Sequence, residues 1–458
     1  MSTNAEVPVA GEWSGRERLT YAVLFILSLV VSAASAVLPP MTGVIAPLLG
    51  VPSDDWIGFV VTTFLLISGF AAIPWAYFAD RTTRRNLLIV STFFWVFWFV
   101  PILLPTTSYW TLYLFYGIAA IGVGATGPLS LSITIDSVPV RWRSTTFGLL
   151  GTAAGAGYGL GYIISGLLVE LLGWQTPFLV IIVVGFAAGL LLFLTREPPR
   201  GQHDESLAEL RAAGGAYTYR LKLSDVRRMW RKPSNIYLVL IGIVAIIPVA
   251  SFGAWAVRWL NVDHSLGIFV ATEFMTLALA SQIAGNAVFG RLGDKLFRKD
   301  KRGRAKLILL CCVVAGPILI AACIYPFAVV PTVTIFDLLF NPATFIFFLL
   351  LFVGTFFDAG ISPLIYVSAG DINPPEIRST AMSLHLLAHV VGVSLGTQLT
   401  PSLAVAFFGG TYSPALTLIC LLFFGAAGLA LLVLRYITGD IKVTDEDVRT
   451  RVKKTKNS

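Results

Sequence analysis

Twelve apolar runs of about 20 residues recur along the chain, and each is long enough to cross the hydrocarbon core of a bilayer. Only 13% of the 458 residues are charged, against roughly 25% in a soluble domain, so there are too few charges to cover a water-facing surface. The runs are continuous and lack the alternation of barrel strands. We therefore expect an all-α integral membrane protein with transmembrane helices at about 19–48, 55–79, 87–105, 109–137, 144–171, 177–195, 236–260, 267–290, 306–328, 344–369, 379–408 and 413–435.

The first run begins like a secretory signal peptide, with Arg16 and Arg18 before an apolar stretch and the small residues Ala-Ser-Ala. It then continues through VLPPMTGVIAPLLG, well past the apolar core of such a signal. We expect a retained first transmembrane helix, which also preserves an even count of spans.

The basic residues predict the orientation. If both termini lie on one side, 32 of the 33 Lys and Arg residues fall on that side or at its edge, with Arg258 as the exception. The positive-inside rule assigns this side to the cytoplasmic face of a cell membrane or inner membrane. The net charge of +8 then indicates affinity for anionic lipid headgroups. Nucleic acid is not an expected partner, because the basic clusters lack interleaved stacking aromatics.

Two stretches are repeated in the second half of the chain. DSVPVRWRST at 136 recurs as DINPPEIRST at 371, an offset of 235 residues that Gly157/Gly392 and Gly161/Gly396 share. AYFADRTTRR (76–85) and GRLGDKLFRK (290–299) also correspond. The repeat predicts six-helix bundles at 1–195 and 236–458, joined by a cytoplasmic linker at 196–235. Parallel repeats of this kind are a transporter plan with the substrate site near the bilayer midplane.

The second pair resembles the signature loop of the major facilitator superfamily, Gly-x-x-x-Asp-Arg/Lys-x-x-Arg-Arg/Lys. The second copy matches fully, and the first has Ala76 at the glycine position. The resemblance implies two pseudo-symmetric six-helix halves and secondary active transport by alternating access, and we expect a monomer. The matching residues are Asp80, Arg81, Arg84 and Arg85 in the first copy and Gly290, Asp294, Lys295, Arg298 and Lys299 in the second.

These loop charges are candidates for a cytoplasmic gate. The acids Asp80 and Asp294 could each meet the positive N-terminus of a helix in the other half. The basic residues could reach the acid that ends a neighbouring helix, Arg84 or Arg85 to Asp136 and Lys295 or Arg298 to Asp371. The alternative is a role in topology and folding only. The complete candidate set is Asp80, Arg81, Arg84, Arg85, Asp136, Arg143, Asp294, Lys295, Arg298, Lys299, Asp371 and Arg378.

Ionisable residues inside the spans are candidates for proton coupling, because charges are costly in hydrocarbon. Asp358 lies near the middle of the tenth span, and a structural acid is its alternative role. His385 and His389 share one face of the eleventh span at i, i+4 spacing, which favours a proton relay or core packing equally. No Cys or carboxylate pattern accompanies them, so we expect no metal, and no motif indicates a cofactor.

Arg258 near the outer end of the seventh span is the first candidate for binding substrate. It could instead snorkel outward, bind an anionic headgroup, or pair with Glu273 on the next span. Glu273 is itself a candidate for binding substrate. Aromatic residues expected to line the substrate path are Phe252, Trp255 and Tyr116.

GLGYIISG (159–166) and REPPRG (196–201) resemble the Spinster branch of the superfamily, whose members move lysophospholipids and sphingosine phosphates. The branch's acidic-basic pair in the first span is replaced here by SAASAVLPP, and its His-Leu-Leu-Gly-Asp appears only as HLLAH. Coupling is then expected at Asp358. The resemblance implies a lysophospholipid-like anion as substrate. Alternatives are a drug, sugar or organic acid, or a non-transporting receptor; an intramembrane enzyme lacks an embedded nucleophile–base pair.

Overall fold

The computed structural model describes residues 15–79, 82–137, 143–197, 229–327, 334–373 and 378–456. Within them, twelve helical segments are long and apolar enough to cross a membrane, which confirms the predicted all-α fold. Several helices run beyond the predicted ends, because hydropathy detects only the apolar part of a helix. The segments are Gly15–Leu48, Asp54–Ala79, Arg84–Leu103, Tyr109–Thr134, Leu149–Leu172, Gln175–Leu194, Pro233–His264, Ile268–Lys299, Gly303–Ile324, Pro342–Ile372, Leu384–Phe408 and Ser413–Thr444.

Contacts divide the chain into two compact units. The first comprises residues 1–38 and 63–219, and the second comprises 39–62 and 220–458. The segment 39–62 comprises the end of the first span, the connection and the start of the second span, and it packs with helices that follow it by almost 200 residues. The division by repeat, at 1–195 and 236–458, stays a prediction about the symmetry of the chain.

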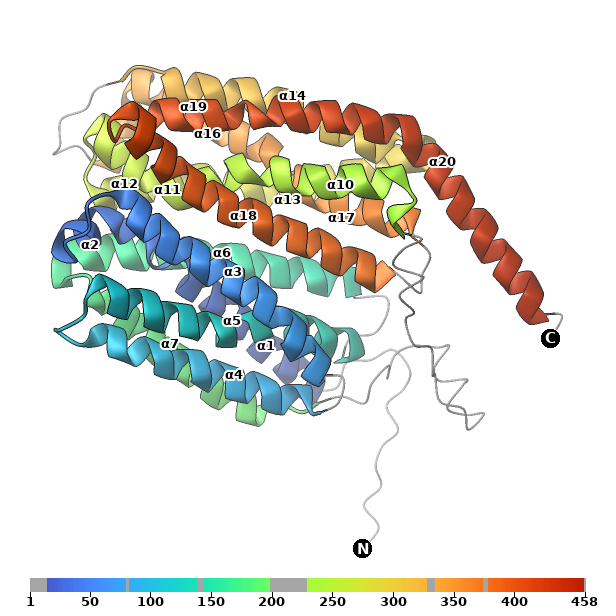
Figure 1. Cartoon of the computed structure of the whole chain (residues 1–458), viewed down its shortest axis with the longest axis horizontal. Helices are drawn as coiled ribbons and strands as arrows, with labels where there is room; N and C mark the ends of the chain where they lie inside the picture. Colours follow the sequence, from blue (N-terminus) through green and yellow to red (C-terminus); the bar gives the residue numbers. More distant parts are fainter. Residues whose placement is uncertain are drawn as a thin grey trace, which may run out of the picture. The chain divides into compact units, whose positions relative to one another are not determined.

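In the first unit, α1 packs along α6, and α4 packs against α5 and α7 (Figure 1). The α3 helix begins in the second unit and continues into the first. The elements are α1 (Gly15–Ala36), α3 (Asp54–Ala79), α4 (Arg84–Phe99), η2 (Val100–Leu103), α5 (Tyr109–Ser137), α6 (Arg143–Leu172), α7 (Gln175–Leu191) and η4 (Leu192–Leu194).

Several spans of the second unit consist of two consecutive helices with one or two residues between them, such as α10 with α11 and α16 with α17. The last helix extends past the ends of α10 and α14 (Figure 1). The elements are η1 (Pro39–Met41), α2 (Thr42–Leu48), α10 (Pro233–Val244), α11 (Ile246–His264), α12 (Ile268–Leu279), α13 (Ser281–Lys299), α14 (Gly303–Ile324), α15 (Ile335–Phe340), α16 (Pro342–Asp358), α17 (Ile361–Ile372), α18 (Arg378–Phe408), α19 (Ser413–Cys420) and α20 (Leu422–Lys456).

The repeated glycines let helices approach closely inside each unit. A Cβ on Gly161 of α6 would lie 2.5 Å from the carbonyl oxygen of Ala33 on α1. A Cβ on Gly396 of α18, the repeat counterpart of Gly161, would clash with the carbonyl oxygen of Ile247 on α11. Small residues at such crossings are typical of membrane helices, where close backbone packing replaces the hydrophobic effect. The 235-residue repeat of these glycines therefore reflects the same helix contact made once in each unit.

Candidate functional site

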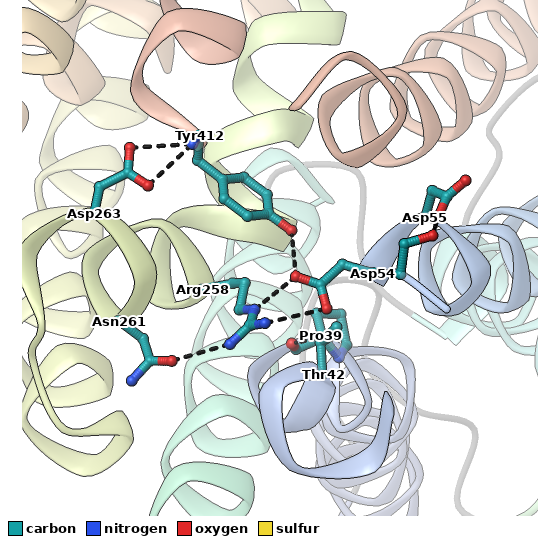
Figure 2. Close-up of polar contacts among 9 residues, drawn as sticks. Pro39, Thr42, Asp54, Asp55, Arg258, Asn261, Asp263 and Tyr412 are labelled. Carbon is teal, nitrogen blue, oxygen red and sulfur yellow. Dashed lines mark hydrogen bonds and ion pairs between the residues drawn. The ribbon is translucent and has the colours of Figure 1, made fainter. Parts of the chain in front are cut away.

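Arg258 is bound by a carboxylate in the second unit. Its Nε donates to Oδ2 of Asp54 at 2.6 Å and its Nη2 to Oδ1 of the same residue at 3.3 Å (Figure 2). Its Nη1 donates to Oδ1 of Asn261 at 3.1 Å. The Arg258 and Asp54 side chains are only 22% and 12% exposed. Such two-point contacts between a guanidinium and a carboxylate are among the stronger polar interactions in proteins.

Tyr412 completes this charge cluster from the loop before α19. Its hydroxyl donates to Oδ2 of Asp54 at 2.8 Å, and its ring stacks on Trp255 with centroids 5.9 Å apart. Burial and the neighbouring Asp54 carboxylate raise the pKa of Tyr412 well above its usual value, so the phenol keeps the proton that it donates. We name Asp54, Arg258, Asn261 and Tyr412 the Arg258 cluster.

Asp263 holds the Tyr412 loop in place (Figure 2). Its Oδ1 and Oδ2 each accept a hydrogen bond from the Tyr412 backbone N–H at 3.0 Å. Oδ2 also accepts from the Ser413 N–H and hydroxyl, each at 2.6 Å. These groups are the first donors of α19, which otherwise lack a partner within the helix. Asp263 therefore fixes the ring that contacts Asp54.

The segment 39–62 makes close contacts beside the Arg258 cluster. A Cβ on Gly43 would lie 2.6 Å from Nη1 of Arg258, and one on Gly58 would lie 3.0 Å from Cζ2 of Trp255. The Thr62 hydroxyl donates to the Ser394 carbonyl oxygen at 3.2 Å. The two glycines thus allow this segment to approach α11 closely enough for Asp54 to reach the guanidinium.

The predicted substrate residues are only partly brought together. Arg258 belongs to the cluster and Trp255 stacks on the Tyr412 ring. Arg258 binds Asp54, and no contact between Arg258 and Glu273 is present among the described residues. Phe252 is buried against Trp259, with ring centroids 5.9 Å apart. Tyr116 belongs to the first unit, where its hydroxyl donates to the Ala34 carbonyl oxygen at 3.4 Å.

Asp358 ends α16 and is buried between helices of the second unit. Its Oδ1 accepts a hydrogen bond from Nε2 of Gln282 on α13 at 3.3 Å. Its Oδ2 has no hydrogen-bond partner in the described part of the chain. Two residues on, Gly360 lies against Phe289 of α13 and Cys311 of α14, so the end of α16 packs on both helices. A carboxyl group satisfied at one oxygen only is suited to carry a proton on the other.

The two histidines of α18 lie in different surroundings. His385 is buried and its Nδ1 has no hydrogen-bond partner among the described residues. The ring of His389 lies 6.4 Å from that of Tyr366 on α17. Across the described ranges, no group of three His, Cys, Asp or Glu residues could hold a metal ion.

Arg84 and Arg85 of the first signature loop are anchored by the stretch that follows the sixth span. Nε of Arg84 donates to Oε1 of Glu197 at 2.8 Å, and Nη1 donates to the Ser132 hydroxyl at 2.8 Å. Arg85 donates through Nη2 to the Phe193 carbonyl oxygen at 2.7 Å. Glu197 belongs to the Arg-Glu-Pro-Pro stretch, so the structure gives this motif a contact with the loop. Asp80, Arg81 and the side chains of Asp136, Arg143 and Arg378 lie outside the described residues.

Arg304, in the first turn of α14, is a residue that the sequence reasoning missed. Its Nη2 donates to Oδ1 of Asp294 at 2.7 Å and its Nη1 contacts Asp371, which joins α13, α14 and α17. Lys295, Arg298 and Lys299 are exposed on the last turns of α13. In the first copy the basic residue at the helix start, Arg84, lies four positions after the motif acid. In the second copy the equivalent helix starts later, so its buried arginine falls beyond the motif.

Comparisons with known proteins place this architecture. Residues 20–341 match the family model described as the Major Facilitator Superfamily. The chain is 29% identical over 189 residues to protein spinster homolog 1 of Xenopus tropicalis, covering 40% of this chain and 34% of that protein. It is 24% identical over 204 residues to the sphingosine-1-phosphate transporter SPNS2 of the same species, covering 44% and 38%. These matches span little more than a third of the relatives' length.

The solved structures agree in fold. A bacterial homologue of the human lysosomal transporter Spinster, in an inward-facing and unoccupied conformation, superposes with a TM-score of 0.76 at 18% identity, covering 94% of this chain and 99% of that one. A D-xylose–proton symporter gives a TM-score of 0.64 at 16% identity, covering 92% and 97%. At these sequence identities, the similarity shows a shared fold only. The family match over residues 20–341, the twelve spans and the Spinster-like relatives together show that the chain belongs to the major facilitator superfamily.

Proposed function

We propose that the chain exports or imports a single-chain amphiphilic anion of the lysophospholipid kind by alternating access, as a monomer driven by protons. Membership of the superfamily makes the chain a membrane transporter and not an enzyme. The proposed orientation puts both termini and the signature loops in the cytoplasm of a cell or inner membrane. The Arg258 cluster, at the opposite ends of its spans, then faces outward.

The observation that carries the substrate class is the environment of Arg258. It is the lone cationic side chain placed away from the cytoplasmic side by the charge pattern, and it is held by a carboxylate beside stacked Trp255 and Tyr412 rings. A guanidinium beside apolar rings suits a ligand with an anionic head and an alkyl chain. The relatives named for spinster and for sphingosine-1-phosphate transport support the same class.

The gating residues have a matching role in this proposal. Arg84 with Glu197 and Arg304 with Asp294 and Asp371 stiffen the loops of their own units, so that each loop presents its remaining charges at the cytoplasmic end. Contacts made by Asp80, Arg81, Arg85, Asp136, Arg143, Lys295, Arg298, Lys299 and Arg378 would hold that end closed and break when it opens inward. His385 and His389 would assist proton movement along α18.

Proton coupling at Asp358 gives the first prediction. In proteoliposomes with a pH-sensitive dye, a lysophospholipid should evoke proton flux in wild-type protein and none in Asp358→Asn, because asparagine cannot take up the proton. Asp337→Asn is the matched control, since Asp337 is exposed in the capping box of α15 and should leave flux unchanged. Equal flux in wild type and Asp358→Asn would refute coupling at this residue. Flux evoked only by sugars or cationic drugs would refute the lipid.

A further inference from the structure

We infer that the Asp54 carboxylate occupies an anion-binding site on Arg258, and that the anionic head of the substrate takes this site when the segment 39–62 withdraws. The inference rests on the proposed function and deepens it. It makes Asp54 both a latch for the outer side and an internal competitor of the substrate.

The donors around Asp54 form a built site for a two-oxygen anion. Nε and Nη2 of Arg258 point at its two oxygens, and the Tyr412 hydroxyl adds a third donor on Oδ2 (Figure 2). Asn261 holds Nη1 and so fixes the plane of the guanidinium. Carboxylate and phosphate oxygens both match the fork of an arginine. The same three donors can therefore hold a phosphate monoester or a carboxylate in place of Asp54.

The donors and the acceptor lie on parts of the chain that are connected differently. Arg258 and Asn261 are on α11, and Tyr412 is pinned to the same unit by Asp263. Asp54 begins α3, and this helix continues into the first unit, as does the chain before Pro39. Asp54 and Arg258 lie in the same unit, but the segment 39–62 is joined at both ends to the first unit. Alternating access moves one bundle against the other, so a pull on these two connections would draw Asp54, and not Arg258, out of the cluster.

Withdrawal of Asp54 alone would leave a largely buried guanidinium without its counter-ion, which is unfavourable. An incoming anion restores the charge balance, so outward opening and anion binding favour each other. Two further contacts of the segment, Gly58 against Trp255 and Thr62 to Ser394, join neutral groups, and an anion could not replace either of them. The charge pair is therefore the point at which a substrate can influence opening.

The test measures the distance between two nitroxide labels in nanodiscs of zwitterionic lipid. Leu48→Cys at the end of α2 and Phe407→Cys at the end of α18 are suitable, since both side chains are exposed. The four native cysteines are buried, and labelling of the parent chain gives the background. The probe is dodecyl phosphate, with dodecyltrimethylammonium as the cationic control of equal chain length. Inorganic phosphate tests whether a free anion is enough to change the distance. Added anionic lipid tests whether a bilayer headgroup is enough.

In the wild type, dodecyl phosphate should populate a longer distance, and the cationic control should not. Asp54→Asn should show the longer distance without ligand and bind dodecyl phosphate about tenfold more tightly, because the competing state is removed. Arg258→Gln should also open but lose the response to dodecyl phosphate. Neutralising the two members of one ion pair is thus predicted to have opposite effects on affinity.

The charge exchange Asp54→Arg with Arg258→Asp separates the latch from the site. It should restore the short distance without restoring any response to dodecyl phosphate. Unchanged or weaker binding by Asp54→Asn, or a wild-type response by Arg258→Gln, would overturn the inference. If binding follows the prediction but no amphiphile is transported, the proposed function fails and the anion site stands. If lysophospholipid is transported but these binding effects are absent, the anion site fails and the proposed function stands.

Discussion

One added methyl group at Gly157 is expected to destabilise the protein, while the same change two residues earlier is not. A Cβ at Gly157 would lie 2.8 Å from both the Cα and the carbonyl carbon of Leu29 on α1. The clash is with backbone, which cannot rotate away, so Gly157→Ala must push α1 from α6. Overpacking of this kind costs about 1–3 kcal/mol.

Gly155→Ala is the matched control on the same helix. A Cβ there meets nothing within 4 Å, so alanine should be neutral or stabilise the helix by up to ~1 kcal/mol. Thermal unfolding in detergent measures the difference, at roughly 2–4 °C for each kcal/mol in a domain of 150–250 residues. One scan rate must serve all variants, since unfolding of such proteins is often irreversible. Equal melting temperatures for the two variants would contradict the close α1–α6 contact.

Loss of Arg304 is the second large effect that we expect. Its side chain is 9% exposed, and it contacts Asp371, which is 25% exposed, and Asp294, which is 58% exposed. It also lies over the Phe297 ring at 4.0 Å. Arg304→Ala removes the cation that joins α13, α14 and α17. The partly buried Asp371 carboxylate then loses its ion pair with this guanidinium. The expected cost is about 1–3 kcal/mol, as for other buried polar groups that lose a partner.

Lys306 provides the comparison for Arg304. It is two residues further along α14 and forms an ion pair with Asp300 at 2.7 Å, with both side chains well exposed. Exposed pairs contribute little, because water and salt screen them. Lys306→Ala should therefore leave the melting temperature unchanged, whereas Arg304→Ala lowers it. An equal fall for both variants would show that the structural role of Arg304 is overstated.

The fold could be predicted because its signals are local. Each transmembrane span is predicted from the apolar residues within it, and the orientation is predicted from the charged residues that flank it. The repeat of Gly157 and Gly161 at Gly392 and Gly396 was also visible in the sequence, although the contact that each glycine permits was not.

The site could be predicted only in part, because its contacts join distant residues. Arg258 stood out by its charge, but its partner Asp54 is 204 residues away and looks like an ordinary acid at a helix start. Tyr412 contacts Asp54 across 358 residues. Arg304 was hidden because α13 runs through the second motif to Lys299, so the next helix begins beyond the motif. Asp358 was singled out by its position alone, and its contact with Gln282 required the packing of α13 against α16.

The most direct test of the account is uptake of radiolabelled lysophosphatidate into proteoliposomes under a pH gradient, beside a neutral monoacylglycerol of the same chain. We predict saturable uptake of the anion above that of protein-free vesicles, and its loss in Arg258→Gln. We predict no protein-dependent uptake of the neutral lipid. Uptake of both lipids at one rate, or full uptake by Arg258→Gln, would contradict an anion transporter whose head-group site is Arg258.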